Sequence, residues 1–201
     1  MIAENLVGFD LLPQTIPHYC IESFRRNDKP DALCFKLDDG WKPISGRDAI
    51  EMIKNIALGL FRLGVRPGDR IAVISENRPE WSLTDLALLA LRAVNVPIYT
   101  TQAAEQIRYI LEDSGAKMLV VSGRKLYKHA EKAVESVERL ENLIFFDAGA
   151  KQDAGKPSYE LAEVESLGAE AQTELNFDIM LGDVRPDDLA TIIYTSGTTG
   201  E

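Results

Sequence analysis

RIAVISENRPEWSLTDLALLALRAVNVPIYT, from Arg70 to Thr100, contains the pattern that decides the fold. Arg70 to Ile74 has the length and apolar character of a short buried strand. Pro79 suits the first turn of a helix, and Glu80 to Ala93 is apolar on almost every side, which predicts a helix buried on most of its faces. A second apolar run at Val96 to Tyr99 completes a strand, helix, strand unit. Such a unit is typical of a parallel sheet covered by helices.

The same alternation continues on both sides of this unit. Apolar residues at helical spacing predict amphipathic helices, glycines mark helix ends, and short β-rich runs lie between them. We expect helices at Pro17 to Asn27, between Ser45 and Gly64, at Ala104 to Ser114, at Leu126 to Val137 and at Tyr159 to Ala169, and strands at Lys117 to Val121, Leu143 to Phe146 and Leu189 to Tyr194. The predicted fold class is α/β, with a largely parallel sheet flanked by helices.

Two stretches interrupt this alternation. DALCFKLDDGWKPI, Asp31 to Ile44, predicts a hairpin whose turn lies at Asp38, Asp39 and Gly40. DAGAKQDAGKPS, Asp147 to Ser158, is small, polar and mixed in charge. We expect it to be a mobile surface loop.

The composition excludes several classes of protein. The chain of 201 residues has 22 Lys and Arg against 32 Asp and Glu, a net charge of −10. We therefore expect no nucleic-acid partner, since that requires basic side chains against phosphate. Cys20 and Cys34 do not have the spacing of a zinc site and predict free thiols in a reducing compartment. The most apolar run, Leu86 to Leu91, is much shorter than the roughly 20 residues of a membrane-spanning helix, and the start does not resemble a signal peptide. We expect a cytoplasmic protein.

The last residues, IIYTSGTTGE, combine glycines with hydroxyl side chains directly after a β-rich run. Glycines let backbone N–H groups converge on an anion, and each hydroxyl donates one hydrogen bond. At the carboxyl end of a strand, where ligands gather in parallel sheets, this composition indicates a phosphate-binding loop. It is not the P-loop, because GxxxxGK[ST] is absent. Its candidate ligand-binding residues are Thr195, Ser196, Gly197, Thr198, Thr199 and Gly200.

YTSGTTG, Tyr194 to Gly200, resembles the phosphate-loop signature of the adenylate-forming enzymes, which include acyl-CoA synthetases, luciferases and the adenylation domains of peptide synthetases. Two upstream stretches, LGVRPGDRIAVISENRPEW (Leu63 to Trp81) and ALRAVNVPIYTTQAAEQIRYILEDSGAKMLVVS (Ala90 to Ser122), are similar to bacterial long-chain fatty acyl-CoA synthetases. One residue departs from the family pattern. Arg92 stands where a glycine is common, and we expect this to affect local helix packing.

The resemblance implies a ligase that works in two steps. A fatty acid attacks the α-phosphate of ATP to give an acyl-adenylate and pyrophosphate, and coenzyme A then displaces AMP to give a thioester. Thr195 to Gly200 would bind the β- and γ-phosphates, and Thr195 would help to position Mg²⁺. Residues 1–201 would be the N-terminal portion of the AMP-binding (adenylation) domain, ending inside the phosphate-binding loop. The C-terminal part and the small lid domain with its catalytic lysine would be absent, so we expect the chain alone to be inactive and to hold no catalytic residue.

Other interpretations stay open at this point. The acid could be an aryl or short-chain carboxylate, since the family's acyl-pocket residues lie downstream, or the chain could be a non-catalytic binding or assembly module. Relatives often pair through N-terminal segments, so the apolar stretch Met1 to Thr15 could mediate a homodimer or could pack on its own domain. A fatty substrate allows at most peripheral membrane association.

Several other residues are of types that often bind a substrate or take part in catalysis, but the neighbouring sequence favours structural roles for them. Asn77 to Trp81 could touch substrate, but Pro79 also suits a helix start and Trp81 a packed anchor. His18 and His129 are isolated from any partner motif, so we expect surface or packing roles for both.

Overall fold

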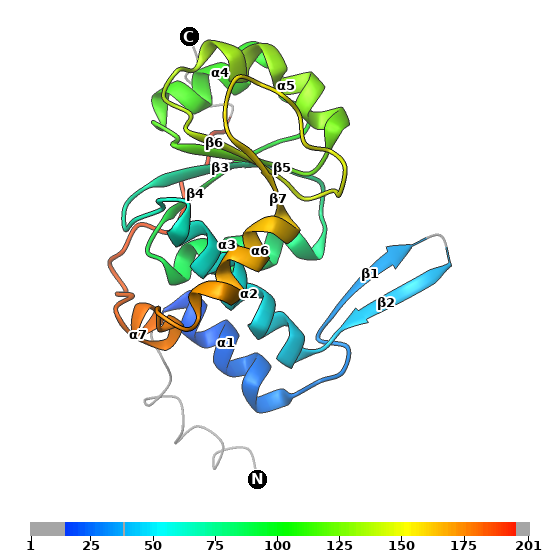
Figure 1. The fold of residues 1–201 in the computed structure, drawn as a ribbon, viewed down its shortest axis with the longest axis vertical. Helices are drawn as coiled ribbons and strands as arrows, with labels where there is room; N and C mark the ends of the chain where they lie inside the picture. The colour runs from blue at the N-terminus through cyan, green and yellow to red at the C-terminus, as the bar shows by residue number, and fades with distance from the viewer. Residues whose placement is uncertain (1–14, 38, 196–201) are drawn as a thin grey trace.

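Five parallel strands form the centre of the structure. The computed structural model describes residues 15–37 and 39–195. Its sheet has the order β4-β3-β5-β6-β7 (Figure 1), and every neighbouring pair is parallel, which confirms the predicted α/β class. The strands are β3 (Arg70–Ile74), β4 (Val94–Ile98), β5 (Met118–Val121), β6 (Asn142–Phe145) and β7 (Ser158–Glu160).

Helices cover both faces of this sheet, as Figure 1 shows. Alternate side chains of β3 point to the two faces: Ile71 and Val73 join one apolar cluster, and Ala72 and Ile74 join the other. All four side chains are 1% exposed or less, so β3 is buried on both sides. The first face is covered by α2 (Gly46–Arg62), α3 (Pro79–Ala90) and α6 (Leu161–Ala171), with α1 (Ile16–Asn27) packed outside α2 and α3, and the second face by α4 (Ala104–Asp113) and α5 (Arg124–Ser136).

Local signals place several helix ends where the sequence predicts them. Ser45 caps α2, because its side chain accepts a hydrogen bond from the Asp48 amide at 3.1 Å. Gly64 and Gly115 follow α2 and α4 with φ of +96° and +66°, a left-handed backbone that glycine adopts at low cost. Pro79 occupies the first turn of α3.

The predicted hairpin lies outside the sheet. β1 (Leu33–Leu37) pairs antiparallel with β2 (Gly40–Ile44), and Figure 1 shows the pair projecting away from the helices. Leu33 and Ile44, at the open end of the hairpin, pack against the core. Asp38 of the predicted turn lies outside the described residues.

The helix predicted to reach Ala93 ends earlier. α3 stops at Ala90, and Arg92 adopts a left-handed backbone with φ +59°. The Gly68 amide donates to the Arg92 carbonyl at 2.8 Å, which turns the chain toward β4. Arg92 lies directly after the helix, where glycine would meet no strain, and its effect on local helix packing stays a prediction.

The region after Asp147 differs most from the prediction. The helix expected at Tyr159 to Ala169 begins at Leu161, because Ser158–Glu160 pair with β6 as strand β7. Three polar or aromatic residues carry little strand signal, so this pairing, and not local sequence, defines the strand. α7 (Phe177–Gly182), which the sequence analysis missed, follows Asn176, whose side chain caps it by accepting from the Ile179 amide at 3.2 Å.

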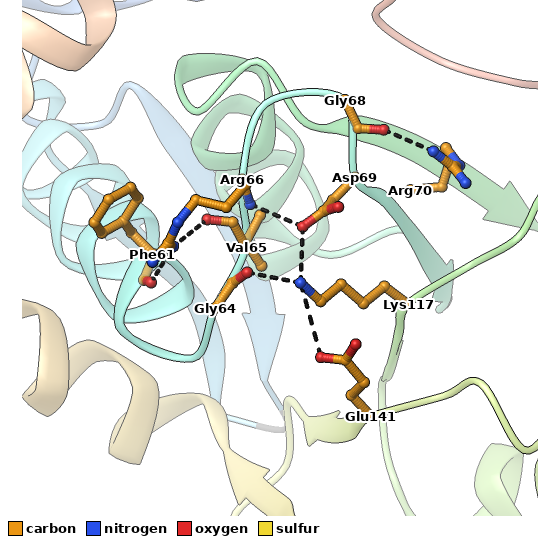
Figure 2. A network of polar contacts seen from close by, with 9 residues as sticks. All are labelled: Phe61, Gly64, Val65, Arg66, Gly68, Asp69, Arg70, Lys117 and Glu141. Carbon is orange, nitrogen blue, oxygen red and sulfur yellow. Dashed lines mark hydrogen bonds and ion pairs between the residues drawn. The ribbon is translucent and has the colours of Figure 1, made fainter.

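A polar network at the amino ends of β3 and β5 fixes the turn that precedes β3 (Figure 2). The Lys117 ammonium donates to the Gly64 carbonyl at 2.8 Å and to the Asp69 carboxylate at 3.1 Å, and lies 3.7 Å from the Glu141 carboxylate. The same Asp69 carboxylate accepts from the Arg66 amide at 2.9 Å. The network therefore connects the end of α2, the turn before β3 and the start of β5.

Two glycines let α2 and α6 cross with their backbones in contact. A Cβ atom on Gly59 of α2 would overlap the carbonyl of Val164, and a Cβ atom on Gly168 of α6 would overlap the carbonyl of Asn55. Beyond the end of α6, the side-chain Nε2 of Gln172 donates to the side-chain oxygen of Asn55 at 2.7 Å. The crossing leaves no room for even one methyl group at either glycine.

Gly168→Ala should therefore lower the free energy of unfolding by about 1–3 kcal/mol or more, because the added methyl forces two backbones apart. Gly182→Ala is the matched control: it also lies in a helix, and a Cβ atom there meets nothing within 4 Å. Helix propensity alone would favour both changes. Urea denaturation followed by circular dichroism compares the midpoints, and a stabilised Gly168→Ala protein would contradict the close crossing.

Candidate functional site

Polar side chains gather at the carboxyl ends of three neighbouring strands. Glu76 and Arg78 follow β3, Ser122 follows β5, and Asp147 lies just after β6. In parallel sheets ligands bind at this edge, where connections from adjacent strands leave toward opposite faces. Such a point lies between β3 and β5, because α3 and α5 cover opposite faces. This edge is therefore the first candidate site.

Arg78 joins two carboxylates at this edge. Its guanidinium donates to both Glu80 oxygens, at 2.8 and 3.2 Å, and to the Asp147 carboxylate at 2.7 Å. The hydrogen bond to Glu80, helped by the one to Asp147, raises the pKa of Arg78. Burial alone would raise the pKa of Glu80, but the hydrogen bond and charge of Arg78 hold it below its usual value. Because both carboxylates neutralise Arg78, its guanidinium connects the loop after β3 with the loop after β6. It is not a free cation for a phosphate.

Ser122 and Gly123 close the point between β3 and β5. The Ser122 hydroxyl donates to the Glu76 carboxylate at 2.6 Å, and this hydrogen bond lowers the pKa of Glu76. A Cβ atom on Gly123 would overlap the Asp147 carboxylate, so glycine lets Asp147 reach its place beside Arg78. The side chains of these three connections thus bind one another, and Glu76 and Arg78 also line an open cavity.

A cavity of about 810 Å³ opens between the hairpin and the loop after β3. Trp41 from the hairpin is 68% exposed on its wall. Asn77, Arg78 and Pro79 line the opposite wall, while Trp81 packs against the core. The favoured structural interpretation of Pro79 and Trp81 is confirmed, and contact of Asn77 to Trp81 with a substrate stays the untested alternative.

The two isolated histidines make local contacts. A ring nitrogen of His18 lies 2.6 Å from the Thr15 hydroxyl, and one of His129 lies 2.6 Å from the Gln102 carbonyl. His18 is half-buried at the start of α1 and His129 is exposed, which agrees with the predicted surface or packing roles.

Thr195 is the one residue of the predicted phosphate-binding loop that the structure describes, and it is exposed. The other candidate residues lie outside the described part of the chain: Ser196, Gly197, Thr198, Thr199 and Gly200. The strand expected before the loop is reduced to one parallel bridge, between Thr191 and Asn95 of β4. There the Asn95 amide donates to the Ala190 carbonyl and the Ile192 amide donates to the Asn95 carbonyl, each at 3.0 Å.

Pro97 explains why this pairing stops. The Asn95 amide faces the incoming segment, so the next donor along the same edge would belong to residue 97, and proline has no N–H. The chain then turns to α4, where the Tyr194 hydroxyl donates to the Asp113 carboxylate at 2.6 Å and its ring packs edge-on against Tyr109 at 6.1 Å. Burial, and then this hydrogen bond, raise the pKa of Tyr194. The residue before the loop is thus anchored on α4.

The fit of the described residues to magnesium is limited. Among residues 15–37 and 39–195, no cluster of three or more His, Cys, Asp or Glu side chains could hold a metal ion. Thr195 offers one hydroxyl oxygen. Magnesium bound there would take most of its ligands from phosphate oxygens and water, which is its usual preference.

Comparison with known sequences gives the family. The chain belongs to the AMP-binding enzyme family, which matches residues 23–201. The long-chain-fatty-acid–CoA ligase FadD15 of Mycobacterium bovis is 37% identical over 178 residues, covering 86% of this chain and 28% of the relative. Fatty acyl-CoA synthetase A of Dictyostelium discoideum is 33% identical over 168 residues, covering 80% of this chain and 24% of the relative. The chain thus spans no more than 28% of the length of these relatives.

Solved structures of adenylate-forming enzymes have the same fold. A long-chain-fatty-acid–CoA ligase of Archaeoglobus fulgidus gives a TM-score of 0.72 at 23% identity, covering 93% of this chain and 36% of that one. The adenylation domain of a carboxylate reductase of Mycobacterium chelonae gives 0.71 at 22% identity, covering 92% and 32%. These comparisons confirm the resemblance that the TSGTTG loop and its upstream stretches indicate.

Arg78→Met should lower the free energy of unfolding by about 1–2 kcal/mol at pH 7, because it leaves Glu80 and Asp147 without their hydrogen-bonded partner at a partly solvated site. The matched control is Arg108→Met, which removes an exposed pair with Glu112 on α4 and should cost about 0.3–0.5 kcal/mol. Urea denaturation measures both.

The cost of Arg78→Met should shrink in acid. Arg78 lowers the pKa of Glu80 in the folded protein, so its stabilisation is present above the unfolded pKa of about 4.3. It is lost as the pH falls through the folded pKa. A cost that stays constant between pH 7 and roughly pH 3 would show that the carboxylates do not carry it.

Proposed function

We propose that the chain is the N-terminal part of an AMP-forming ligase that activates a fatty acid with ATP and transfers the acyl group to coenzyme A. The family match over residues 23–201, with 37% identity to a long-chain-fatty-acid–CoA ligase, carries this proposal. The substrates are then a fatty acid, ATP and coenzyme A, and the cytoplasm is the proposed location. The remainder of the adenylation domain and the lid domain would supply the catalytic residues, so the chain alone should form no acyl-adenylate.

In this proposal Thr195 to Gly200 bind the β- and γ-phosphates of ATP. The hydroxyls and backbone amides are neutral donors placed before the reaction, and they stabilise the charge that develops on the leaving pyrophosphate. Mg²⁺ would arrive with ATP and neutralise phosphate charge, with the Thr195 hydroxyl as one ligand. The anchor of Tyr194 on Asp113 holds the base of the loop.

A ligase for another carboxylate is the second candidate. Coronafacic acid ligase of Pectobacterium brasiliense gives a TM-score of 0.69 at 21% identity over 87% of this chain and 33% of that one, so the same fold serves a different acid in that protein. The fatty acid is favoured because the relatives with 33–37% sequence identity are named for it.

Assembly and membrane contact are finer parts of the proposal. The mass of the protein in solution tests whether it forms a homodimer through Met1 to Thr15. Ligase activity of the complete protein tests whether the chain instead belongs to a non-catalytic binding or assembly module. Of the helices in the described part of the chain, none combines the length and apolar character needed to span a bilayer. We propose at most peripheral association with lipid, driven by the acyl substrate.

Fatty-acid-dependent exchange of pyrophosphate into ATP tests the proposal in the complete protein that carries this chain. Thr198→Ala and Thr199→Ala should each lower the exchange rate by about a hundredfold or more, the usual cost of removing one preorganised donor. Thr173→Ala is the control, since that exposed hydroxyl donates only to the Glu170 carbonyl among the described residues. Full exchange in both loop variants would refute the assigned loop, and exchange with aryl or short acids alone would select the second candidate.

A further inference from the structure

Arg92 connects the body of the sheet to the segment that enters the phosphate-binding loop. Its guanidinium donates two hydrogen bonds to the Asp188 carboxylate, one from Nε at 2.8 Å and one from Nη2 at 2.9 Å. The Arg185 amide donates to the same carboxylate at 2.8 Å. This bidentate ion pair, called the fork below, fixes the orientation of the two side chains as well as their distance. The side chains are 31% and 21% exposed, so water screens the pair only in part.

The backbone of Arg92 is itself held in place. Its carbonyl accepts from the Gly68 amide at 2.8 Å, and the Val94 amide donates to the Asp69 carbonyl at 2.8 Å. Asp69 in turn belongs to the Lys117 network shown in Figure 2. The guanidinium of Arg92 is therefore carried on a turn that is tied to the centre of the sheet.

The segment that Arg92 holds has few other attachments to the sheet. After Asp188, its backbone makes two hydrogen bonds to β4, both to Asn95, and Pro97 prevents the next one. Two hydrogen bonds provide little main-chain pairing to define the register of this segment. The ion pair with Arg92 attaches the segment at Asp188, three residues before the bridge between Thr191 and Asn95.

The conformation of Arg92 also needs compensation. At φ +59° an L side chain meets a steric cost that glycine does not. A glycine would serve the turn, but it could not reach Asp188. The ion pair with Asp188 is therefore what arginine adds at this position compared with glycine.

We infer that Arg92 is a positioning residue for the phosphates of ATP: its bidentate pair with Asp188 sets the register and direction of residues 189–195, the segment that leads to the proposed phosphate-binding residues. The inference rests on the proposed function for its catalytic consequence. The structural part, the control of residues 189–195 by Arg92, stands without it.

The structural part is tested by amide hydrogen exchange on the 201-residue chain. In Arg92→Gly the turn keeps its backbone and loses the fork, so the Ile192 and Asn95 amides should exchange about three- to tenfold faster. The Val73 and Val120 amides, in β3 and β5, should not change. Arg185→Gln is the control, because it removes a nearby charge whose guanidinium makes no hydrogen bond within the described residues. Unchanged exchange at Ile192 in Arg92→Gly would overturn the inference.

The catalytic part is tested by steady-state kinetics of the complete enzyme. Arg92→Gly and Asp188→Asn should each raise the KM for ATP by about three- to tenfold, with the KM for the fatty acid unchanged and no further effect in the double variant. Arg92→Lys, which keeps the charge but not the fork, should fall between. Equal changes in both KM values, or a fall in kcat alone, would assign Arg92 a general structural role and overturn the inference. A wild-type enzyme without ATP-dependent ligation would refute the proposed function and leave the exchange result standing.

Discussion

The backbone hydrogen bonds of β3 are the interaction on which the rest of the structure depends. β3 pairs with β4 on one edge and β5 on the other, and its side chains are buried on both faces. No water can replace these bonds at such a position. The connections to its neighbours also set the layers. The chain moves from β3 to β4 in one direction and from β4 to β5 in the other, so right-handed crossovers place α3 and α4 on opposite faces.

The sequence specifies this core well because each of its signals is local. The apolar run of β3, the proline that starts α3 and the glycines after α2 and α4 act on the backbone where they stand. Prediction fails where a distant partner decides. Ser158–Glu160 form a strand only because β6 offers an edge, and α3 ends at Ala90 because the turn at Arg92 bonds to Gly68. No short-range pattern contains either fact.

The candidate site also has a part that local sequence predicts and a part that depends on distant partners. The residue types of TSGTTG predict a phosphate-binding loop, since glycines let backbone amides converge and hydroxyls add donors, and this stays a prediction because only Thr195 of the loop lies in the described part of the chain. Its approach cannot be deduced, because the path depends on Pro97 ending the pairing with β4 and on Asp113 receiving Tyr194. The general rule for parallel sheets points instead to the gap between β3 and β5. In this chain, the Ser122 hydroxyl donates to the Glu76 carboxylate at that point, and Glu76 also lines the cavity beside the hairpin.

The two edges of the sheet therefore have different tasks in the described part of the chain. At the carboxyl ends of the strands, Arg78 is neutralised by Glu80 and Asp147, so its guanidinium contributes to the fold and is not available to an anion. At the amino edge, Lys117 holds Asp69, and the turn beside it carries Arg92 toward Asp188. In the proposed function, a loop that binds phosphate through neutral donors depends on its geometry, because a hydrogen bond weakens steeply as it is misaligned. In the proposal above, the ion pair of Arg92 with Asp188 serves this positioning.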